Sequence, residues 1–238
     1  MSLRNKRVLI IGGTSGIGLA VAAAVAERGG TPVVASRRPS SVDRALGSLP
    51  AGAVGATVDL ADPASIERLA EQVGHVDHLV YTAGEPLQTV ALAGLTPDVI
   101  TAFYQTRFVG ACSTVRVVGP RLPRDGSITL TSGSAAEQPE FGVLPVSLCG
   151  AMNALTAALA VELAPVRVNA VAPGVVHSPL WDYMGKQDRD SMFADAAERI
   201  PLRRIAEADE VARAYLYCME QTYSTGALVK VDGGSVLT

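Results

Sequence analysis

Short apolar runs rich in β-branched residues alternate with longer, Ala- and Leu-rich segments along most of the chain. The short runs predict buried strands, and the longer periodic segments predict helices. The expected strands are Arg7–Ile11, Thr31–Ser36, Val54–Asp59, His78–Tyr81, Ser127–Thr131, Val166–Ala172 and Leu228–Val231. The expected helices are Gly16–Arg28, Pro63–Val73, Pro97–Val118, Gly150–Leu163 and Asp209–Glu220. This order predicts an α/β protein with a doubly wound parallel sheet of about seven strands and helices on both faces.

A glycine-rich turn follows the first predicted strand and leads into the first predicted helix. It reads Gly-Gly-Thr-Ser-Gly-Ile-Gly from Gly12 to Gly18. Gly12 can adopt a backbone angle closed to other residues, while Gly16 and Gly18 let a pyrophosphate approach the first helical turn. The free amides there favour an anion. The alternative is a tight turn in a Gly-rich chain, but the position between strand and helix favours a Rossmann-type dinucleotide site.

Composition and charge narrow the class of protein. The chain has 238 residues, 48% hydrophobic and 18% charged, which suits one large domain spanning residues 1–238. The formal net charge is −3 and no Lys or Arg run exceeds two residues, so nucleic acid is not an expected partner. No stretch reaches the roughly 18 apolar residues of a membrane span, so we expect a soluble, cytoplasmic protein and no membrane partner.

The three cysteines are Cys112, Cys149 and Cys218. Their number is odd and their spacing matches no ligand motif, so the sequence predicts neither a disulfide framework nor a metal site.

Several ordered motifs together resemble those of the short-chain dehydrogenase/reductase family. They are the glycine turn Gly12–Gly18, Asp59-Leu60, Ala83-Gly84, the segment Arg167–Gly174 and the segment Val231–Gly234. The resemblance covers essentially the whole chain and implies an NADP(H)- or NAD(H)-dependent oxidoreductase acting on a small carbonyl or hydroxyl compound. It also implies a homo-oligomer, either a tetramer or a dimer. Apolar residues on several faces of the predicted helices Pro97–Val118 and Gly150–Leu163 favour the same conclusion.

By this resemblance, Asp59 meets the adenine edge and Leu60 its face, Ala83-Gly84 runs beside the adenosine ribose, and the segment Pro173–Ser178 holds the nicotinamide amide. The expected cofactor-binding residues are Gly12, Thr14, Ser15, Gly16, Ile17, Gly18, Arg37, Arg38, Asp59, Leu60, Ala83, Gly84, Pro173, Gly174, Val176 and Ser178. Two places depart from the family pattern. Ile11 stands where the family usually has Thr, and Tyr81-Thr82 stands where it usually has Asn-Asn.

The end of the second predicted strand bears on the choice of cofactor. It carries Arg37 and Arg38 where an acidic residue would bind a free ribose 2′-hydroxyl. Two guanidinium groups offer planar donor pairs to a 2′-phosphate, so we expect NADP(H) rather than NAD(H). The alternative is a solvated Arg pair on a loop.

The catalytic positions differ from those of the family, which uses a Tyr-x-x-x-Lys pair, a Ser and an Asn. Alignment of the fifth helix places Pro145 at the Tyr position and Cys149 at the Lys position. No alternative pair is near, because no lysine occurs between Lys6 and Lys186 and no tyrosine between Tyr104 and Tyr183.

The Asn position holds Arg107, a candidate catalytic residue. A fixed guanidinium can stabilise an oxyanion or bind a carboxylate, although it could equally brace the helix through an ion pair. Strand register places Gly133 at the Ser position, whereas spacing to the fifth helix favours Ser132, with Ser134 adjacent. We interpret Cys149 as a small core residue.

By the same resemblance, residues 179–200 are expected to form a substrate lid. Trp181, Tyr183, Met184, Met192 and Phe193 suit either an apolar ligand or packing of the lid on the core. His177 just before the lid is a weaker acid–base candidate.

Three functions remain open at this point. They are an NADPH-dependent oxidoreductase with a remade proton path, a non-redox lyase, cyclase or isomerase, and a cofactor-binding protein without catalysis. We favour the first because the cofactor motifs are kept.

Overall fold

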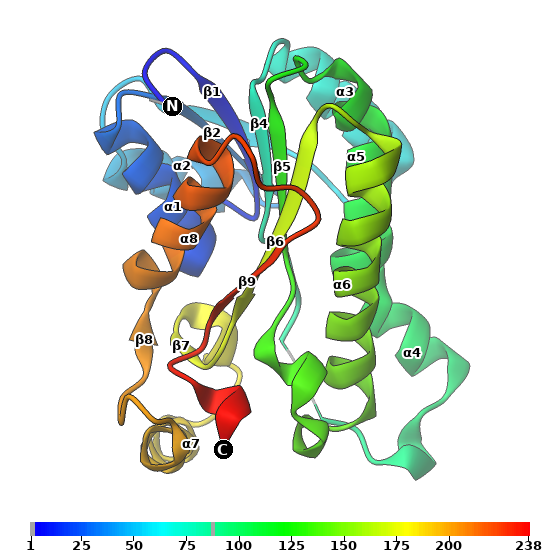
Figure 1. Ribbon diagram of the computed structural model, residues 1–238, viewed down its shortest axis with the longest axis vertical. Coiled ribbons are helices and arrows are strands. Elements are labelled where there is room, and N and C mark those ends of the chain that lie inside the picture. The colour runs from blue at the N-terminus through cyan, green and yellow to red at the C-terminus, as the bar shows by residue number, and fades with distance from the viewer. Residues whose placement is uncertain (1–2, 87–88) are drawn as a thin grey trace.

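The computed structural model describes residues 3–86 and 89–238, and within them a central parallel sheet carries helices on both faces (Figure 1). The seven strands across this sheet are, in order, β3 (Val54–Thr57), β2 (Thr31–Ser36), β1 (Arg7–Ile11), β4 (His78–Tyr81), β5 (Ser127–Thr131), β6 (Arg167–Pro173) and β9 (Leu228–Val231). The doubly wound α/β fold predicted from the sequence is confirmed.

Two layers of helices cover the sheet. The α-helices in the described part of the chain are α1 (Gly16–Glu27), α2 (Pro39–Ser48), α3 (Pro63–Val73), α4 (Pro97–Tyr104), α5 (Gly110–Val118), α6 (Val143–Glu162), α7 (Lys186–Arg199) and α8 (Ala208–Glu220). Helices α1, α2 and α8 lie on one face, and α3, α5 and α6 on the other (Figure 1). Helices α4 and α7 lie toward the lower end of that view.

Strand β1 shows why the sheet needs both layers. Leu9 and Ile11 are fully buried in the core under α3, α5 and α6, while Val8 and Ile10 are fully buried in the core under α1 and α8. Alternate side chains of a strand point to opposite faces, so an unbroken apolar run predicts a central strand covered on both sides.

The order of the strands reverses beside β1. The chain runs outward from β1 to β2 and β3, then returns to place β4 on the other side of β1. The register pairs Ile11 with Ala35 on β2 and with Tyr81 on β4, so the carboxyl ends of these strands are level. In such sheets the ligand binds in the crevice where the strand order reverses.

The segment Pro97–Val118, expected to be one α-helix, is divided by a π-helical turn over Gln105–Val109. At that turn the amide of Gly110 donates to the carbonyl of Gln105, five residues earlier, instead of four residues earlier as in an α-helix. The prediction of one continuous α-helix was therefore wrong at the π turn, where one extra residue is inserted between α4 and α5.

Other boundaries differ from expectation by shorter stretches. Helix α6 begins at Val143 and not at Gly150. Strand β3 ends at Thr57 and not at Asp59, because the Asp59 carboxylate turns the chain by accepting the amide of Ala61 at 3.0 Å. The remaining expected helices and strands agree with the structure within one residue at each end.

Several elements were not expected at all. Helix α2 follows Arg38 and begins with a proline at its first position. Helix α7 fills most of the expected lid, although Ala196 is its only buried residue. Two short strands, β7 (Val176–His177) and β8 (Ala206–Glu207), form a separate parallel pair before and after it. Such polar or two-residue elements carry no clear hydrophobic period.

Helix α6 also corrects the expectation that no segment is long and apolar enough to span a membrane. Among the described residues, its 20 residues pass that test by length and composition. Leu148 and Met152 of this helix are buried, and Met152 and Ala160 belong to the core cluster beneath the sheet. A long apolar helix inside a domain meets the same criteria.

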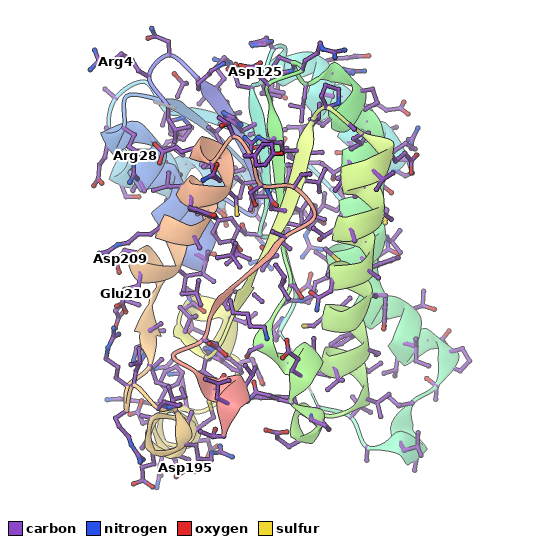
Figure 2. The ribbon with its side chains drawn as sticks, in the orientation of Figure 1. Arg4, Arg28, Asp125, Asp195, Asp209 and Glu210 are labelled. Carbon is purple, nitrogen blue, oxygen red and sulfur yellow. The ribbon has the colours of Figure 1, made fainter. Side chains whose placement is uncertain are left out.

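Charged side chains of both signs lie at the periphery of the molecule (Figure 2). Figure 2 shows Arg28, Asp195 and Asp209 at the outer edge of the molecule, away from the sheet. Beside Asp209, the Glu210 carboxylate binds Arg204 at 2.6 Å and caps α8 by accepting the amide of Glu207 at 2.9 Å. These bonds fix the start of α8.

Candidate active site

The glycine turn after β1 is packed so closely that side chains cannot replace its glycines. Gly12 has a φ of 82°, and a Cβ there would lie 2.6 Å from the amide nitrogen of Ala83. Gly16 has a φ of 48°, and a Cβ at Gly18 would collide with the carbonyl oxygen of Gly12. The side chain of Ser15 does not cap α1, so the first amides of this helix stay open to an anionic ligand.

A cavity of about 860 Å³ runs along the carboxyl ends of the strands from this turn. It is lined by every residue that the sequence assigned to the cofactor: Gly12, Thr14, Ser15, Gly16, Ile17, Gly18, Arg37, Arg38, Asp59, Leu60, Ala83, Gly84, Pro173, Gly174, Val176 and Ser178. The catalytic candidates Arg107, Ser132 and Ser134 line the same cavity. Six loops thus converge on one site.

One end of the cavity is basic. Arg37 and Arg38 are exposed there, and within residues 3–86 and 89–238 neither forms an ion pair. Arg38 is the N-cap of α2, and Ser41 in the first turn of that helix also lines the cavity. Sequence reasoning missed Ser41, although a Pro-Ser-Ser run directly after two arginines is typical of a helix start.

The loop after β6, at another part of the cavity wall, is held by the last strand. The amide of Gly174 donates to the carbonyl of Val231 at 3.0 Å, and a Cβ at Gly174 would lie 2.9 Å from the Cα of Asp232. The motif at the end of the chain therefore holds the loop after β6 in place, which explains why both motifs occur in one sequence.

Arg107 places a positive charge beside this cavity. It lies in the π turn, and its Nη2 donates to the carbonyl of Glu85 at 2.6 Å. Its guanidinium covers the α-carbon of Gly84, where a Cβ would lie 2.7 Å from Nε and Nη1. Burial lowers the pKa of Arg107, but guanidinium groups in proteins stay charged.

No carboxylate of the described residues lies within ion-pair distance of Arg107, although the negative charge of Glu85 acts to raise the pKa of this guanidinium. Among the residues that the structure describes, Arg107 takes part in no ion pair, so the bracing ion pair weighed from the sequence is absent. The guanidinium instead braces the loop after β4 through a backbone carbonyl and leaves donors for a ligand.

Cys149 stands next to Arg107 in the cavity wall. A Cβ at Gly133 would lie 3.0 Å from the Cys149 Sγ, so the thiol fills the space in front of the loop after β5. Burial raises the pKa of Cys149, while the charge of Arg107 acts in the opposite direction. Pro145, one turn earlier on α6, also lines the cavity and has no proton to give.

The two serines after β5 have different surroundings. The Ser132 hydroxyl is 2.6 Å from Asn153 Oδ1 and 3.0 Å from the carbonyl of Cys149, so its proton is directed toward α6. Ser134 is buried, lines the cavity and makes no side-chain hydrogen bond within the described residues. Of the two serines, Ser134 has the hydroxyl that is free for a ligand.

The expected lid contributes both cavity wall and packing. Trp181, Tyr183, Met184 and Met192 line the cavity. Phe193 packs instead against Ile200 and the ring of His177, at a centroid distance of 4.4 Å. His177 is exposed and is not part of the cavity wall, so its proposed acid–base role is not supported by its position.

Sequence reasoning missed several residues at the substrate end. Thr89, Gln105 and Phe141 line the cavity, and none belongs to a motif. Among the described residues, no group of three or more His, Cys, Asp or Glu side chains could hold a metal ion.

Comparison with known proteins identifies the family. The sequence profile described as enoyl-(acyl carrier protein) reductase matches residues 12–236. A short-chain dehydrogenase/reductase from Malbranchea aurantiaca, malC, is 37% identical over 255 residues, which cover 99% of this chain and 96% of that protein. The chain belongs to the short-chain dehydrogenase/reductase family.

Two solved structures share its fold over nearly the whole chain. The MalC reductase/Diels-Alderase from Malbranchea aurantiaca superposes with a TM-score of 0.91 at 34% identity, covering 99% of this chain and 98% of that one. The second is an NADPH-bound short-chain oxidoreductase from Pseudomonas aeruginosa PAO1, described as containing an atypical catalytic centre. It superposes with a TM-score of 0.89 at 27% identity, covering 97% of this chain and 98% of that one.

Proposed function

We propose that this protein is an NADP(H)-dependent oxidoreductase that acts on a small carbonyl or hydroxyl compound and uses Arg107 at the reacting oxygen. The observation that carries the proposal is a guanidinium beside the cavity without a carboxylate partner among the described residues. Family membership supports the oxidoreductase class, and the conversion of one oxygen between carbonyl and hydroxyl is the chemistry that such a charge assists.

The residues present fit NADP(H). The closely packed glycine turn and the open amides of α1 suit a pyrophosphate, since a Cβ at Gly12 or Gly18 would fill that space. Arg37 and Arg38 suit the 2′-phosphate. The NADPH bound to the Pseudomonas relative supports the same choice. When bound, the nicotinamide supplies or accepts the hydride.

The protein's own residues then manage the charge and position of the substrate oxygen. Arg107 offers a planar donor pair whose positive charge stabilises an oxyanion. The free hydroxyl of Ser134 can donate to the same oxygen. Burial raises the pKa of the Cys149 thiol and so makes it a weaker acid, and Pro145 carries no side-chain proton. The proposed proton path to the oxygen is therefore a serine hydroxyl or water.

The experiment measures NADPH absorbance with a panel of small aldehydes and ketones. Arg107→Ala should slow turnover of the best substrate roughly 10²-fold or more, the effect of losing one oxyanion donor. Arg107→Lys should restore only part of the rate, because lysine keeps the positive charge but lacks the planar pair of N–H donors. Gly84→Ala should also slow turnover, since its Cβ displaces the guanidinium without removing it.

Arg116→Ala is the matched control. Arg116 lies on α5 and pairs with Glu67 at 3.4 Å on the surface, so its loss should leave the rate unchanged. If Arg107→Ala lowers the melting temperature by many degrees and leaves activity per folded molecule intact, Arg107 is structural and the proposal is wrong.

A second candidate is a non-redox lyase, cyclase or isomerase. The Malbranchea relative is described as a reductase and a Diels-Alderase, which makes ring formation a specific alternative in this family. Product formation that depends on Arg107 without any change in NADPH absorbance would favour this class. A cofactor-binding protein without catalysis would bind NADPH and turn over nothing.

We also propose that the protein is a cytoplasmic homo-oligomer. Exposed apolar side chains on the outer helices support the oligomer, among them Ile100 on α4 and Val143 and Val161 on α6. Burial of such a surface against a second copy is the usual way to cover it.

A further inference from the structure

The π turn that carries Arg107 leaves one backbone carbonyl without its helical partner. In an α-helix the amide of Gly110 would donate to the carbonyl of Thr106, but here it donates to the carbonyl of Gln105. The hydroxyl of Tyr81 donates to the carbonyl of Thr106 instead. A side chain from the end of β4 thus takes the place of a main-chain donor.

The space around the Tyr81 hydroxyl depends on a glycine in the turn. A Cβ at Gly110 would lie 2.6 Å from the Tyr81 hydroxyl oxygen, so a larger residue would push the phenol away from Thr106. Tyr81 is itself 1% exposed. The tyrosine, the glycine and the π turn therefore fit one another as a set.

Further hydrogen bonds hold Tyr81 from behind. The Thr131 hydroxyl donates to the carbonyl of Tyr81 at 2.6 Å. Because that proton is used, the Tyr215 hydroxyl must be the donor in its 2.6 Å contact with Thr131. A chain of bonds thus runs from α8 through β5 to β4 and, through the Tyr81 ring, to the π turn.

We propose that Tyr81 is a positioning residue for Arg107: its hydroxyl replaces the Gly110 amide at the Thr106 carbonyl and so holds the π turn that lays the guanidinium over Gly84. One residue of helical register corresponds to a rotation of about 100°. Return of this turn to α-helical register would therefore rotate Arg107 about the helix axis, relative to α5, and off Gly84. The inference rests on the role proposed for Arg107, but its test uses neither substrate nor cofactor.

The test uses Cys149 as a reporter of the guanidinium. The rate of Cys149 alkylation by iodoacetamide is followed against pH, and the modified peptide is quantified by mass spectrometry so that Cys112 and Cys218 do not interfere. Arg107→Met should move the half-maximal pH upward by about one unit, because a neighbouring positive charge favours the thiolate. Tyr81→Phe should move it by a similar amount.

The double variant Tyr81→Phe/Arg107→Met should move the half-maximal pH of Cys149 alkylation no further than Arg107→Met alone, since both changes act through the same guanidinium. Tyr104→Phe is the matched control. Its hydroxyl binds Ser147 at 2.9 Å on α6, and the substitution keeps the ring that packs against Phe108 of the π turn, so the Cys149 profile of this variant should match that of the unmodified protein.

Gly110→Ala disturbs the bond between the Tyr81 hydroxyl and the Thr106 carbonyl from the side of the π turn. This variant tests the proposal if Tyr81→Phe does not fold. It should shift the Cys149 profile as Arg107→Met does. An unshifted profile in folded Tyr81→Phe or Gly110→Ala overturns the proposal. So does a Tyr81→Phe shift that adds to that of Arg107→Met, or an Arg107→Met variant with no shift. These outcomes say nothing of NADPH turnover, which tests the proposed function separately.

Discussion

His78 is buried at the start of β4, with 3% of its surface exposed and its Nδ1 2.9 Å from the Ser127 hydroxyl. Burial lowers the pKa of this imidazole from 6.5 to about 4, and the charges of Arg167 and Lys6 act in the same direction. Asp77 and Asp125 oppose the shift. This difference between the ordinary pKa and the pKa in the folded protein corresponds to about 3 kcal/mol of preference for the neutral imidazole over the charged one.

The sign of the pH dependence follows from proton binding. Above pH 6.5 His78 is neutral in both states and contributes no slope. Between pH 6.5 and about 4 the unfolded chain binds the proton and the folded protein does not, so the free energy of unfolding falls as the pH falls. Below about pH 4 both states are charged and the loss is complete, at about 3 kcal/mol.

Urea unfolding at constant ionic strength and protein concentration, from pH 7.5 to 3.5, measures this loss. Other groups titrate in the same range, so the quantity of interest is the difference from His78→Asn, which keeps a polar group near Ser127 but does not titrate. The unmodified protein should lose about 3 kcal/mol more than His78→Asn over this range. His75→Asn is the control, because the His75 side chain is 64% exposed. Parallel curves for His78→Asn and the unmodified protein would refute the assignment.

Three further predictions concern cofactor, lid and assembly. NADPH should bind more tightly than NADH in calorimetry, and Arg37→Ala should reduce the difference between the two binding free energies by on the order of 1–3 kcal/mol. Equal affinities of the unmodified protein for the two cofactors would contradict the assignment of Arg37 and Arg38 to the 2′-phosphate. Trp181 lines the cavity, so its emission should change on NADPH addition; a silent Trp181 with binding shown independently would place the lid elsewhere. Light scattering should show an oligomer that Val161→Glu dissociates, since Val161 is 80% exposed on α6, and a monomer at micromolar concentration would refute it.

The parts of the fold that the sequence predicted are those whose cause is local. The glycine turn could be recognised because Gly12 needs a positive φ and Gly18 touches the backbone of its own turn. The central strands could be recognised because burial on both faces makes Val8–Ile11 continuously apolar. Helix α7 was not predicted because Ala196 is its only buried residue, so its sequence has no apolar stripe that would indicate a helix.

The π turn could not be predicted for a different reason. Its cause is a hydroxyl from Tyr81, which precedes Thr106 by 25 residues and meets it only once β4 is in the sheet. The sequence around Gln105–Val109 continues the helical pattern of its neighbours. Tyr81 was noticed as a departure from the family pattern, but its partner was not visible from the sequence.

The replacements at the catalytic positions are physically linked. A lysine at Cys149 would bring a second cation against the Arg107 guanidinium in a partly buried site, and like charges at such distance strongly disfavour each other. A neutral thiol removes that repulsion, so Arg107 can remain charged beside α6. Under the proposed function, the π turn supplies the positive charge that the family supplies from the fifth helix. A tyrosine whose acidity depends on that lysine would lose its support. The sequence alignment that places Pro145 and Cys149 at the two positions of the pair therefore predicts a joint loss that has a physical reason.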